Sequence, residues 1–382
     1  MGPEGAGGDS PLDRSLLAQL VEPWYSSLAD PAASQRATLE VLLEGYGKTA
    51  YGREHGASSV DGIEGFRRAF PISNYSSLSP YIAKVRGGDD QALLPEPSAA
   101  WVMTRGTTSR SKVLPVGATH LAQILAFGSR AIVNFALNKD SAVLEKPVLN
   151  LNFPSEVHEM ELGGRVKTYG YSSGTYARVH SELMGARLIP KQEEIDALGG
   201  GITESDWERR YELAYQSAKG EDVGSLMGVT PVILGFAHYI KRKHGRWPKD
   251  LWRPRALFCT SVAKIHTRYE RVLGSLFGAS PIVEMYTATE GAFAQQRDGN
   301  PYVSPNYDGY LFEVQTGAGV KMLHELKPNE WGSVLVSTTM LPRYSIGDLV
   351  ESLGRGYFRV FGRDRVLTRV EHHLFNLLAL RR

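Results

Sequence analysis

Residues 99–120 read AAWVMTRGTTSRSKVLPVGATH, and the fold can be worked out from this segment in both directions. Two apolar runs flank a polar loop that contains a glycine, which predicts a strand, a hairpin loop and a second strand. A helix is expected to follow at about residues 118–136. It carries apolar side chains on nearly every face, so we expect it to be central and largely buried.

Beyond this segment, strands and helices alternate along the chain. Strands are expected at residues 148–153, 256–260, 282–286 and 333–338, and helices at residues 204–219, 231–244 and 263–277. Strands separated by helices of this length predict a layered α/β architecture with substantially parallel pairing. The last third, from about residue 301 to 360, has glycine-punctuated strands that are typical of antiparallel pairing.

The expected fold class is α/β, with mixed, partly parallel sheets flanked by helices and a smaller antiparallel β region. We expect a flexible N-terminus at residues 1–12, one large multi-sheet domain at residues 13–360, and a short C-terminal segment at residues 361–382. A single large domain is favoured because no long proline-, glycine- or serine-rich linker interrupts the chain before about residue 350.

The composition excludes several classes of function. Of 382 residues, 43 are Lys or Arg and 41 are Asp or Glu, so the net charge of +2 creates no strong attraction to nucleic acid or an acidic membrane. The one cysteine, Cys259, permits no intrachain disulfide and fits a reducing compartment. No signal peptide and no run of about 18 apolar residues occurs. We therefore expect a cytoplasmic protein without membrane or nucleic-acid partners.

The polar loop at residues 104–112 is the first candidate for chemistry. It reads TRGTTSRSK, so hydroxyl groups surround a glycine, and Lys112 closes the run. The amides and hydroxyls of such a loop can donate hydrogen bonds to phosphate oxygens, with the lysine ammonium as a counter-charge. An exposed polar hairpin turn is an equally good interpretation of this stretch alone. The loop lacks the spacing of a Walker A motif.

Three later turns follow or join apolar strands. In YTATEG, residues 286–291, Glu290 lies past the carboxyl end of a strand, where ligands of α/β sheets usually bind and where a carboxylate could hold magnesium. In LPRYSIGD, residues 341–348, Asp348 could accept hydrogen bonds from both hydroxyls of a ribose. A solvated glutamate and an aspartate-stabilised turn are the simpler alternatives. FGRDRVL, residues 361–367, is another charged turn.

In this order and with these strand contexts, the stretches match one known pattern. The chain resembles the adenylate-forming superfamily of acyl-CoA synthetases, peptide-synthetase adenylation domains and luciferases. It is more closely similar to the Gretchen Hagen acyl acid amido synthetases of plants and their microbial relatives, whose entry segment resembles FPISNYSSLSPYIAKVRGG at residues 70–88. The resemblance extends from about residue 20 to about residue 370 and implies a large N-terminal domain of the adenylate-forming type.

The resemblance assigns roles in phosphate and metal chemistry. Thr107, Thr108, Ser109 and Lys112 match the family's phosphate-binding loop. Thr289 matches the hydroxyl that meets the α-phosphate, and Glu290 matches the carboxylate that binds magnesium. Lys112, Thr289 and Glu290 are therefore the expected catalytic residues, with ATP and Mg²⁺ as cofactors.

Other residues match positions that hold the nucleoside and the acid. Tyr286 matches the aromatic residue that packs on adenine, and Asp348 matches the aspartate that binds ribose. Arg363 falls at the arginine beside the hinge to a small C-terminal domain. The segment that walls the adenine and acyl pockets corresponds to Thr260, Ser261 and Val262. By position, the acid is expected near Phe127, Val229 and Thr230.

The chain departs from the family in two places. Arg105 and Arg110 stand where the phosphate loop usually has a serine or threonine and a glycine. Two extra cations could strengthen triphosphate binding, but their bulk could also prevent the loop from folding over the nucleotide. The family also has a small mobile domain after the hinge, whereas only residues 366–382 follow it in this sequence.

The expected function is ATP- and Mg²⁺-dependent activation of a carboxylic acid as an acyl-adenylate, with pyrophosphate release, followed by acyl transfer to an amine or a thiol. A protein partner could supply a lid or carry the acyl group. The competing hypothesis is a catalytically reduced nucleotide-binding remnant, or a half-enzyme that needs a partner for the second step.

Several other features are interpreted as structural. We expect Cys259 to be a buried thiol, because it lies in the apolar run ALFCT. His372 and His373 are interpreted as surface residues. The basic run at residues 241–255 could bind nucleic acid or a carrier, but a solvated helix end is the simpler interpretation. Tyr169, Tyr171 and Tyr176 could equally line a pocket or stabilise a loop.

Overall fold

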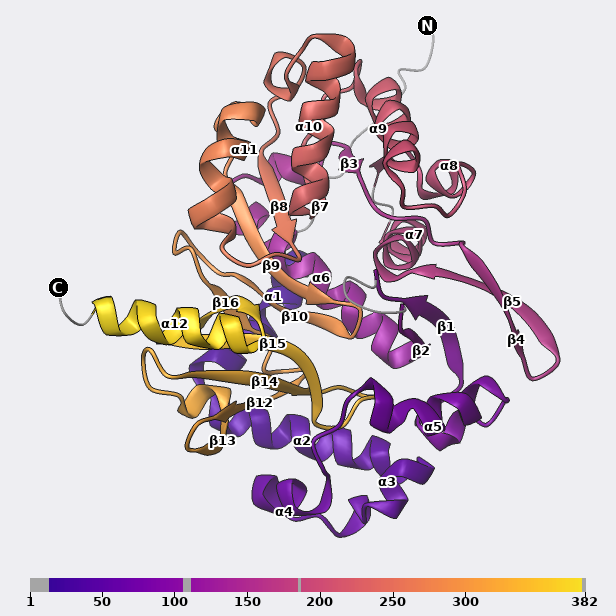
Figure 1. The fold of residues 1–382 in the computed structure, drawn as a ribbon, viewed down its shortest axis with the longest axis vertical. Helices are drawn as coiled ribbons and strands as arrows, with labels where there is room; N and C mark the ends of the chain where they lie inside the picture. Colours follow the sequence, from indigo (N-terminus) through magenta and orange to yellow (C-terminus); the bar gives the residue numbers. More distant parts are fainter. Residues whose placement is uncertain (1–13, 106–110, 185–186, 380–382) are drawn as a thin grey trace, which may run out of the picture.

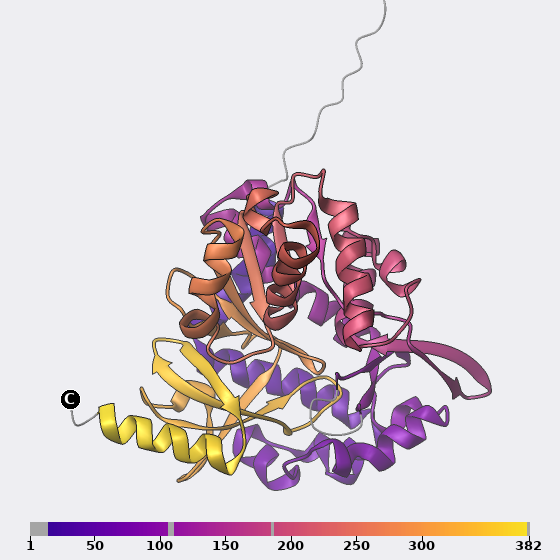
Figure 2. The same cartoon turned by 45° about the horizontal axis from the view of Figure 1, so that its top comes forward.

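The computed structural model describes residues 14–105, 111–184 and 187–379. It contains one sheet of 12 strands and one of four strands, with helices packed against them (Figures 1 and 2). The predicted α/β class with mixed sheets is confirmed. The expected flexible N-terminus, residues 1–12, lies outside the described residues. No helix in the described ranges is long and apolar enough to cross a membrane.

Five strands of the large sheet are parallel and lie in the order β6-β3-β7-β8-β9. Their bounds are β3 Val148–Asn150, β6 Leu188–Ile189, β7 Ser225–Val229, β8 Ala256–Thr260 and β9 Ile282–Ala288. β3 ends at Asn150, three residues before the expected end. Cys259 is fully buried in β8, as predicted, and burial raises the pKa of its thiol to about 12. The parallel register brings the carboxyl ends of β7, β8 and β9 to one edge.

The same sheet continues through β10 into antiparallel strands, in the order β9-β10-β11-β16-β15-β14-β12-β13. These strands are β10 Gly291–Gln296, β11 Val303–Pro305, β12 Leu311–Thr316, β13 Gly319–Met322, β14 Trp331–Ser337, β15 Tyr344–Gly354 and β16 Tyr357–Arg363. The predicted antiparallel character of the last third is confirmed. The turn between β9 and β10 consists of Thr289 and Glu290, which places both at the edge where the carboxyl ends of β7, β8 and β9 lie.

The four-stranded sheet has the order β2-β1-β5-β4. It is formed by β1 Ser98–Met103, β2 Val113–Gly117, β4 His158–Leu162 and β5 Arg165–Tyr171. β1 and β2 pair antiparallel, which confirms the predicted strand, loop and strand. β4 and β5 form a hairpin that projects from the body of the molecule (Figure 1). β1 and β5 pair in parallel near Met103 and Tyr171, so the helix after β5 starts beside the end of β1.

The long helix α6, Ala118–Asn138, follows β2 and is largely buried, as predicted. N-terminal helices pack around it and around the antiparallel strands. They are α1 Arg14–Ala29, α2 Pro31–Gly47, α3 Ala50–Glu54, α4 Gly62–Ala69 and α5 Tyr75–Arg86. Because α6 is apolar on most of its circumference, it can contact several layers at once.

Helices from the middle of the chain cover the face of the parallel strands that lies opposite α6 (Figure 1). They include α9 Glu204–Ala218, α10 Thr230–His244 and α11 Glu270–Phe277, the last preceded by a π-helical turn at Ile265–Tyr269. Two more helices, α7 Ser172–Met184 and α8 Gln192–Asp196, lie beside the strand ends. The basic run begins in the last turn of α10, which confirms the predicted helix end.

The C-terminal helix α12, Val366–Ala379, follows β16 directly. The prediction that His372 is a surface residue is wrong. Its ring stacks on Phe361, with ring centroids 3.9 Å apart, and lies edge-on to Trp331 at 5.2 Å. His373 is exposed, as predicted. β16 extends to Arg363, so the expected domain boundary at residue 360 falls inside a strand.

Candidate active site

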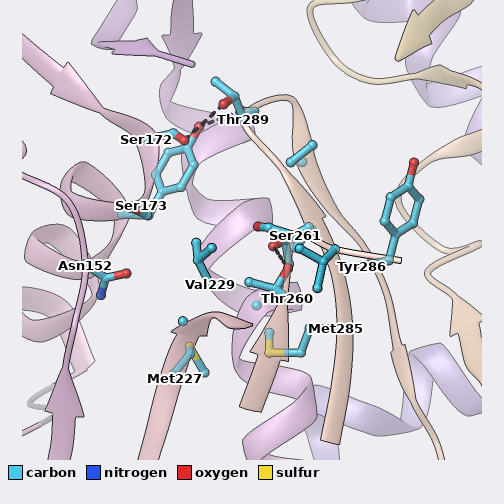
Figure 3. Close-up of a pocket in the computed structure, with 18 of the residues that line it drawn as sticks. Asn152, Ser172, Ser173, Met227, Val229, Thr260, Ser261, Met285, Tyr286 and Thr289 are labelled. Carbon is cyan, nitrogen blue, oxygen red and sulfur yellow. Dashed lines mark hydrogen bonds between the residues drawn. The ribbon is translucent and has the colours of Figure 1, made fainter. Parts of the chain in front are cut away.

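A cavity of about 740 Å³ opens where the carboxyl ends of β7, β8 and β9 meet α6 and α7 (Figure 3). It extends from Thr289 at one end of the view to Met227 and Met285 at the other. The ends of parallel strands are the usual ligand site of an α/β sheet, because loops and helix starts converge there. This cavity is therefore the candidate active site.

Most of the site residues predicted from the sequence line this cavity. They are Lys112, Val229, Thr260, Ser261, Val262, Tyr286, Thr289, Glu290, Asp348 and Arg363. Thr107, Thr108 and Ser109 lie outside the described residues. Residues separated by as many as 251 positions in the chain, from Lys112 to Arg363, thus share one cavity.

Two predicted acid-binding residues do not line the cavity. Phe127 lies on another side of α6, where its ring packs edge-on against Tyr310 and beneath the Arg130 guanidinium, 3.9 Å from the ring centroid. The Thr230 hydroxyl donates a hydrogen bond to the Thr260 carbonyl at 2.9 Å. Thr230 therefore holds the end of β8 from behind the cavity wall. Contrary to the prediction, neither Phe127 nor Thr230 lines the cavity.

Glu290 and Lys112 form the charged corner of the cavity. Burial raises the pKa of Glu290, and the Lys112 ammonium only partly opposes that rise. The Lys112 Nζ atom lies 3.4 Å from the Tyr344 hydroxyl. Burial, and then the Glu290 charge, raise the pKa of Tyr344, so this hydroxyl remains protonated beside the carboxylate. The corner therefore combines the buried carboxylate of Glu290 with the ammonium of Lys112, which has only a long contact to Tyr344.

Thr289 is fixed by the first turn of α7. Its hydroxyl lies 3.1 Å from that of Ser172, and the Tyr176 hydroxyl donates a hydrogen bond to its carbonyl at 3.0 Å (Figure 3). Tyr171 and Tyr176 line the cavity and Tyr169 does not, so the pocket interpretation holds for two of the three tyrosines. Ser172 was missed, although its place in a glycine- and tyrosine-rich stretch after a strand was a usable signal.

Asp348 is held by two donors. The Tyr286 hydroxyl donates to one carboxylate oxygen at 3.0 Å, and Arg363 donates to the other at 2.8 Å. A carboxylate has about four acceptor positions, so two remain for a ligand. The ring of Tyr286 is itself buried against Phe293 and Phe358, at 5.5 and 6.0 Å between ring centroids.

The wall after β8 has an unusual backbone. The Thr260 hydroxyl lies 2.7 Å from that of Thr287 on the neighbouring strand, which ties the two strand ends together. Ser261 follows with φ of 72°, in the left-handed region. A residue with a side chain seldom adopts this conformation, and such strain is concentrated at ligand-binding sites. The turn presents Ser261 and Val262 to the cavity.

Arg105, the first departure from the family pattern, also lines the cavity. Its guanidinium lies over the ring of Phe153, 5.4 Å from the centroid, and burial lowers its pKa. In the described parts of the chain it forms no ion pair. The bulk of Arg105 therefore packs toward the residues after β3. Arg110 lies outside the described residues.

Glu284, two positions before Tyr286, was not predicted as a site residue but lines the cavity. Burial raises the pKa of its carboxyl to about 7. The Nε2 atom of His266 is 3.6 Å from the carboxylate, beyond hydrogen-bonding distance. Burial therefore dominates, and Glu284 titrates near neutral pH.

This pKa gives a stability prediction with a definite sign. The folded chain binds the Glu284 proton more tightly than the unfolded chain does. The contribution of Glu284 to the free energy of unfolding is therefore full below about pH 4.5 and is lost as the pH rises toward 7. The loss amounts to roughly 3 kcal/mol. Glu284→Gln, which is neutral throughout, should flatten the dependence. Urea unfolding at pH 5 and pH 8 measures it, and an identical pH dependence in both proteins would contradict the prediction.

The charged corner fits a magnesium ion that arrives with a nucleotide. Among the described residues, no three His, Cys, Asp or Glu side chains are grouped as a metal cage. Magnesium usually takes only one or two carboxylates, together with phosphate oxygens and water. Glu290, a single buried carboxylate in this corner, meets that requirement.

The fold, with its large mixed sheet and small second sheet, is similar to that of solved adenylate-forming enzymes. The AtGH3.15 acyl acid amido synthetase in complex with 2,4-DB superposes with a TM-score of 0.75 at 15% identity, over 96% of this chain and 72% of that chain. A 2-hydroxyisobutyryl-CoA ligase in the postadenylation state, with 2-HIB-AMP, superposes with a TM-score of 0.61 at 14% identity, over 87% and 67%.

The sequence also matches a family. Residues 24–196 match the GH3 family N-terminal domain. The predicted resemblance to the adenylate-forming superfamily, and within it to the GH3 amido synthetases, is therefore confirmed. No curated protein is significantly similar in sequence to this chain. The structural similarity establishes the fold, since the identities are low.

Proposed function

We propose that this protein activates a carboxylic acid with ATP and Mg²⁺, forming an acyl-adenylate and pyrophosphate, and then transfers the acyl group to an amine or a thiol. The observation that carries the proposal is the convergence of Lys112, Thr289, Glu290 and Asp348 on one cavity. They come from three different motifs of the resemblance, and each has the polarity that its role requires.

The first step is attack by an oxygen of the acid's carboxylate on the α-phosphorus of ATP, with pyrophosphate as the leaving group. Two anions must approach each other, so the site has to screen charge and align the reactants. Lys112 would supply the mobile positive charge, and the hydroxyl of Thr289, which is held beside Ser172, would donate to an α-phosphate oxygen. No side chain has to transfer a proton in this step.

Different residues of the cavity would hold the nucleoside and the metal ion. The two free acceptor positions of Asp348 suit the ribose hydroxyls, and Tyr286 and the turn at Thr260, Ser261 and Val262 would form the wall for adenine. Glu290 would hold Mg²⁺, which when bound supplies charge neutralisation at the phosphates.

The acceptor and the cellular setting belong to the proposal as well. An amine acceptor agrees with the match to the GH3 family, and a thiol acceptor agrees with the similarity of fold to a CoA ligase. A protein partner that supplies a lid or a carrier is compatible with the open cavity. A cytoplasmic location is supported by the single buried cysteine.

A second candidate is a nucleotide-binding half-enzyme, which the bulk of Arg105 in the cavity favours. The deciding experiment measures pyrophosphate released from MgATP with pooled aryl, indole, fatty and amino acids. Acid-dependent release would support the synthetase, and adding amines or thiols would then identify the acceptor. Binding of ATP without release in every pool would favour the half-enzyme.

A further inference from the structure

A hydrogen-bonded pair of polar side chains lies in the apolar part of the cavity. Ser129 on α6 and His180 on α7 both line the cavity, and Ser129 Oγ is 2.9 Å from His180 Nε2. The apolar side chains of Leu125 and Ile132, one turn before and after Ser129 on α6, line the cavity with them, as does Met227 on β7. The reaction proposed above uses neither side chain.

The pair is far from the reacting corner. Ser172, Tyr176 and His180 all line the cavity and are spaced four residues apart, so they share one face of α7. Ser172 contacts Thr289 beside Glu290. His180 follows eight residues later, which corresponds to about 12 Å along the helix. A molecule that reacts near Thr289 would therefore meet Ser129 and His180 with its distal end.

The two side chains offer acceptors and no free donor. The single hydroxyl proton of Ser129 is donated to the Leu125 carbonyl at 2.7 Å. We therefore assign the proton between Ser129 and His180 to Nε2 of the imidazole. Burial lowers the pKa of His180, which keeps the ring neutral and its Nδ1 atom an acceptor. What remains is one lone pair on Ser129 Oγ and the lone pair of His180 Nδ1.

We propose that Ser129 and His180 form a hydrogen-bond-accepting subsite for the distal end of the acid, so that the preferred substrate is an apolar carboxylic acid with a hydroxyl or N–H group at that end. The inference rests on the proposed function, because it assumes that an acid occupies the cavity. A distal methyl, ether or carbonyl group cannot satisfy these acceptors, and binding such a group would leave them desolvated and unpaired.

The test compares acids that differ only at the distal group. Benzoate, phenylacetate and cinnamate are each used with a para hydroxyl, unsubstituted, and with a para methoxy group. The methoxy group preserves an oxygen but removes the donor. Affinity is measured by calorimetry in the presence of a nonhydrolysable ATP analogue, and KM and kcat are measured by pyrophosphate release. In at least one length series, the hydroxyl acid should bind about 10- to 100-fold more tightly than both analogues.

Ser129→Ala should reduce this preference to within about threefold, by raising KM for the hydroxyl acid while leaving kcat for the unsubstituted acid little changed. His180→Phe, which keeps a ring but no nitrogen, should have the same effect. The matched control is Ser275→Ala. Ser275 also bonds a carbonyl of its own helix, Val272 at 2.7 Å, but it is exposed on α11 and does not line the cavity. This control should retain the full preference.

The outcomes separate the two proposals. If no acid causes pyrophosphate release, the result would count against the proposed synthetase. The calorimetric affinities would still show whether the cavity prefers acids with a distal hydroxyl group. Equal affinity for the three members of every series, or no binding of any member, would overturn the inference. A hydroxyl preference that survives in Ser129→Ala would also overturn it, because the pair would then act only as a contact between α6 and α7.

Discussion

Pyrophosphate release is expected to fall about 100- to 1,000-fold when Glu290 is replaced by glutamine. The amide has the same shape but cannot provide the anion that would hold Mg²⁺ against the phosphates. Glu290 is buried in the two-residue turn between β9 and β10, and the nearby carboxylate of Asp348 already accepts hydrogen bonds from Tyr286 and Arg363. The measurement is the initial rate of acid-dependent release from MgATP.

The fold of this variant should remain intact. Burial raises the pKa of Glu290, which means that its charge destabilises the folded chain. The variant with a neutral amide should therefore unfold at the same temperature as the unmodified protein or slightly higher. Glu330→Gln makes the same chemical change outside the cavity and should release pyrophosphate at the original rate. Equal rates for Glu290→Gln and the unmodified protein would reject the role of Glu290.

Strand ends were the part of the site that the sequence could predict. A carboxylate or hydroxyl directly after an apolar strand reaches the same edge as its counterparts on parallel neighbours, whatever the loops do. Thr260, Thr289 and Glu290 follow this rule, and all three line the cavity. The order of these motifs along the chain was enough to indicate the fold.

The helical part of the cavity could not be predicted in the same way. α6 is apolar on nearly every face, so periodicity does not define which face meets the ligand. Phe127 and Ser129 are two positions apart, which is about 200° around a helix. The large apolar Phe127 packs on Tyr310, while the small polar Ser129 lines the cavity. Choosing the aromatic residue as the acid contact failed because size and hydrophobicity do not determine direction.

Other sites depended on tertiary contacts. His372 is buried because its ring is sandwiched near Phe361 and Trp331, which come from two different strands of the sheet. The direction of the Arg105 side chain follows from Phe153, 48 residues later in the chain. Local sequence could not identify any of these neighbours, because they become adjacent only when β3, β14 and β16 take their places in the sheet.

A buried ion pair joins the N-terminal helices to the strand that carries Asp348. Glu313 on β12 is 1% exposed and accepts from two arginines, with Nε of Arg343 and Nε of Arg67 each 2.9 Å from a carboxylate oxygen. Arg343 also donates to the carbonyl of Phe70 at 2.8 Å. β15 begins at the next residue, Tyr344, so the position of Arg343 fixes the start of the strand that leads to Asp348.

Glu313→Ala is expected to lower the free energy of unfolding by about 3–5 kcal/mol, because it leaves two guanidinium groups with no buried counter-charge. Urea unfolding at pH 7 measures the change. The control is Glu330→Ala, which removes the partly exposed partner of Lys321 and should change stability by less than about 1 kcal/mol. A loss below about 1 kcal/mol for Glu313→Ala would show that water or rearranged side chains compensate the arginines. Because Arg343 would then lose two acceptors at the start of β15, a full effect should also weaken ATP binding through Asp348.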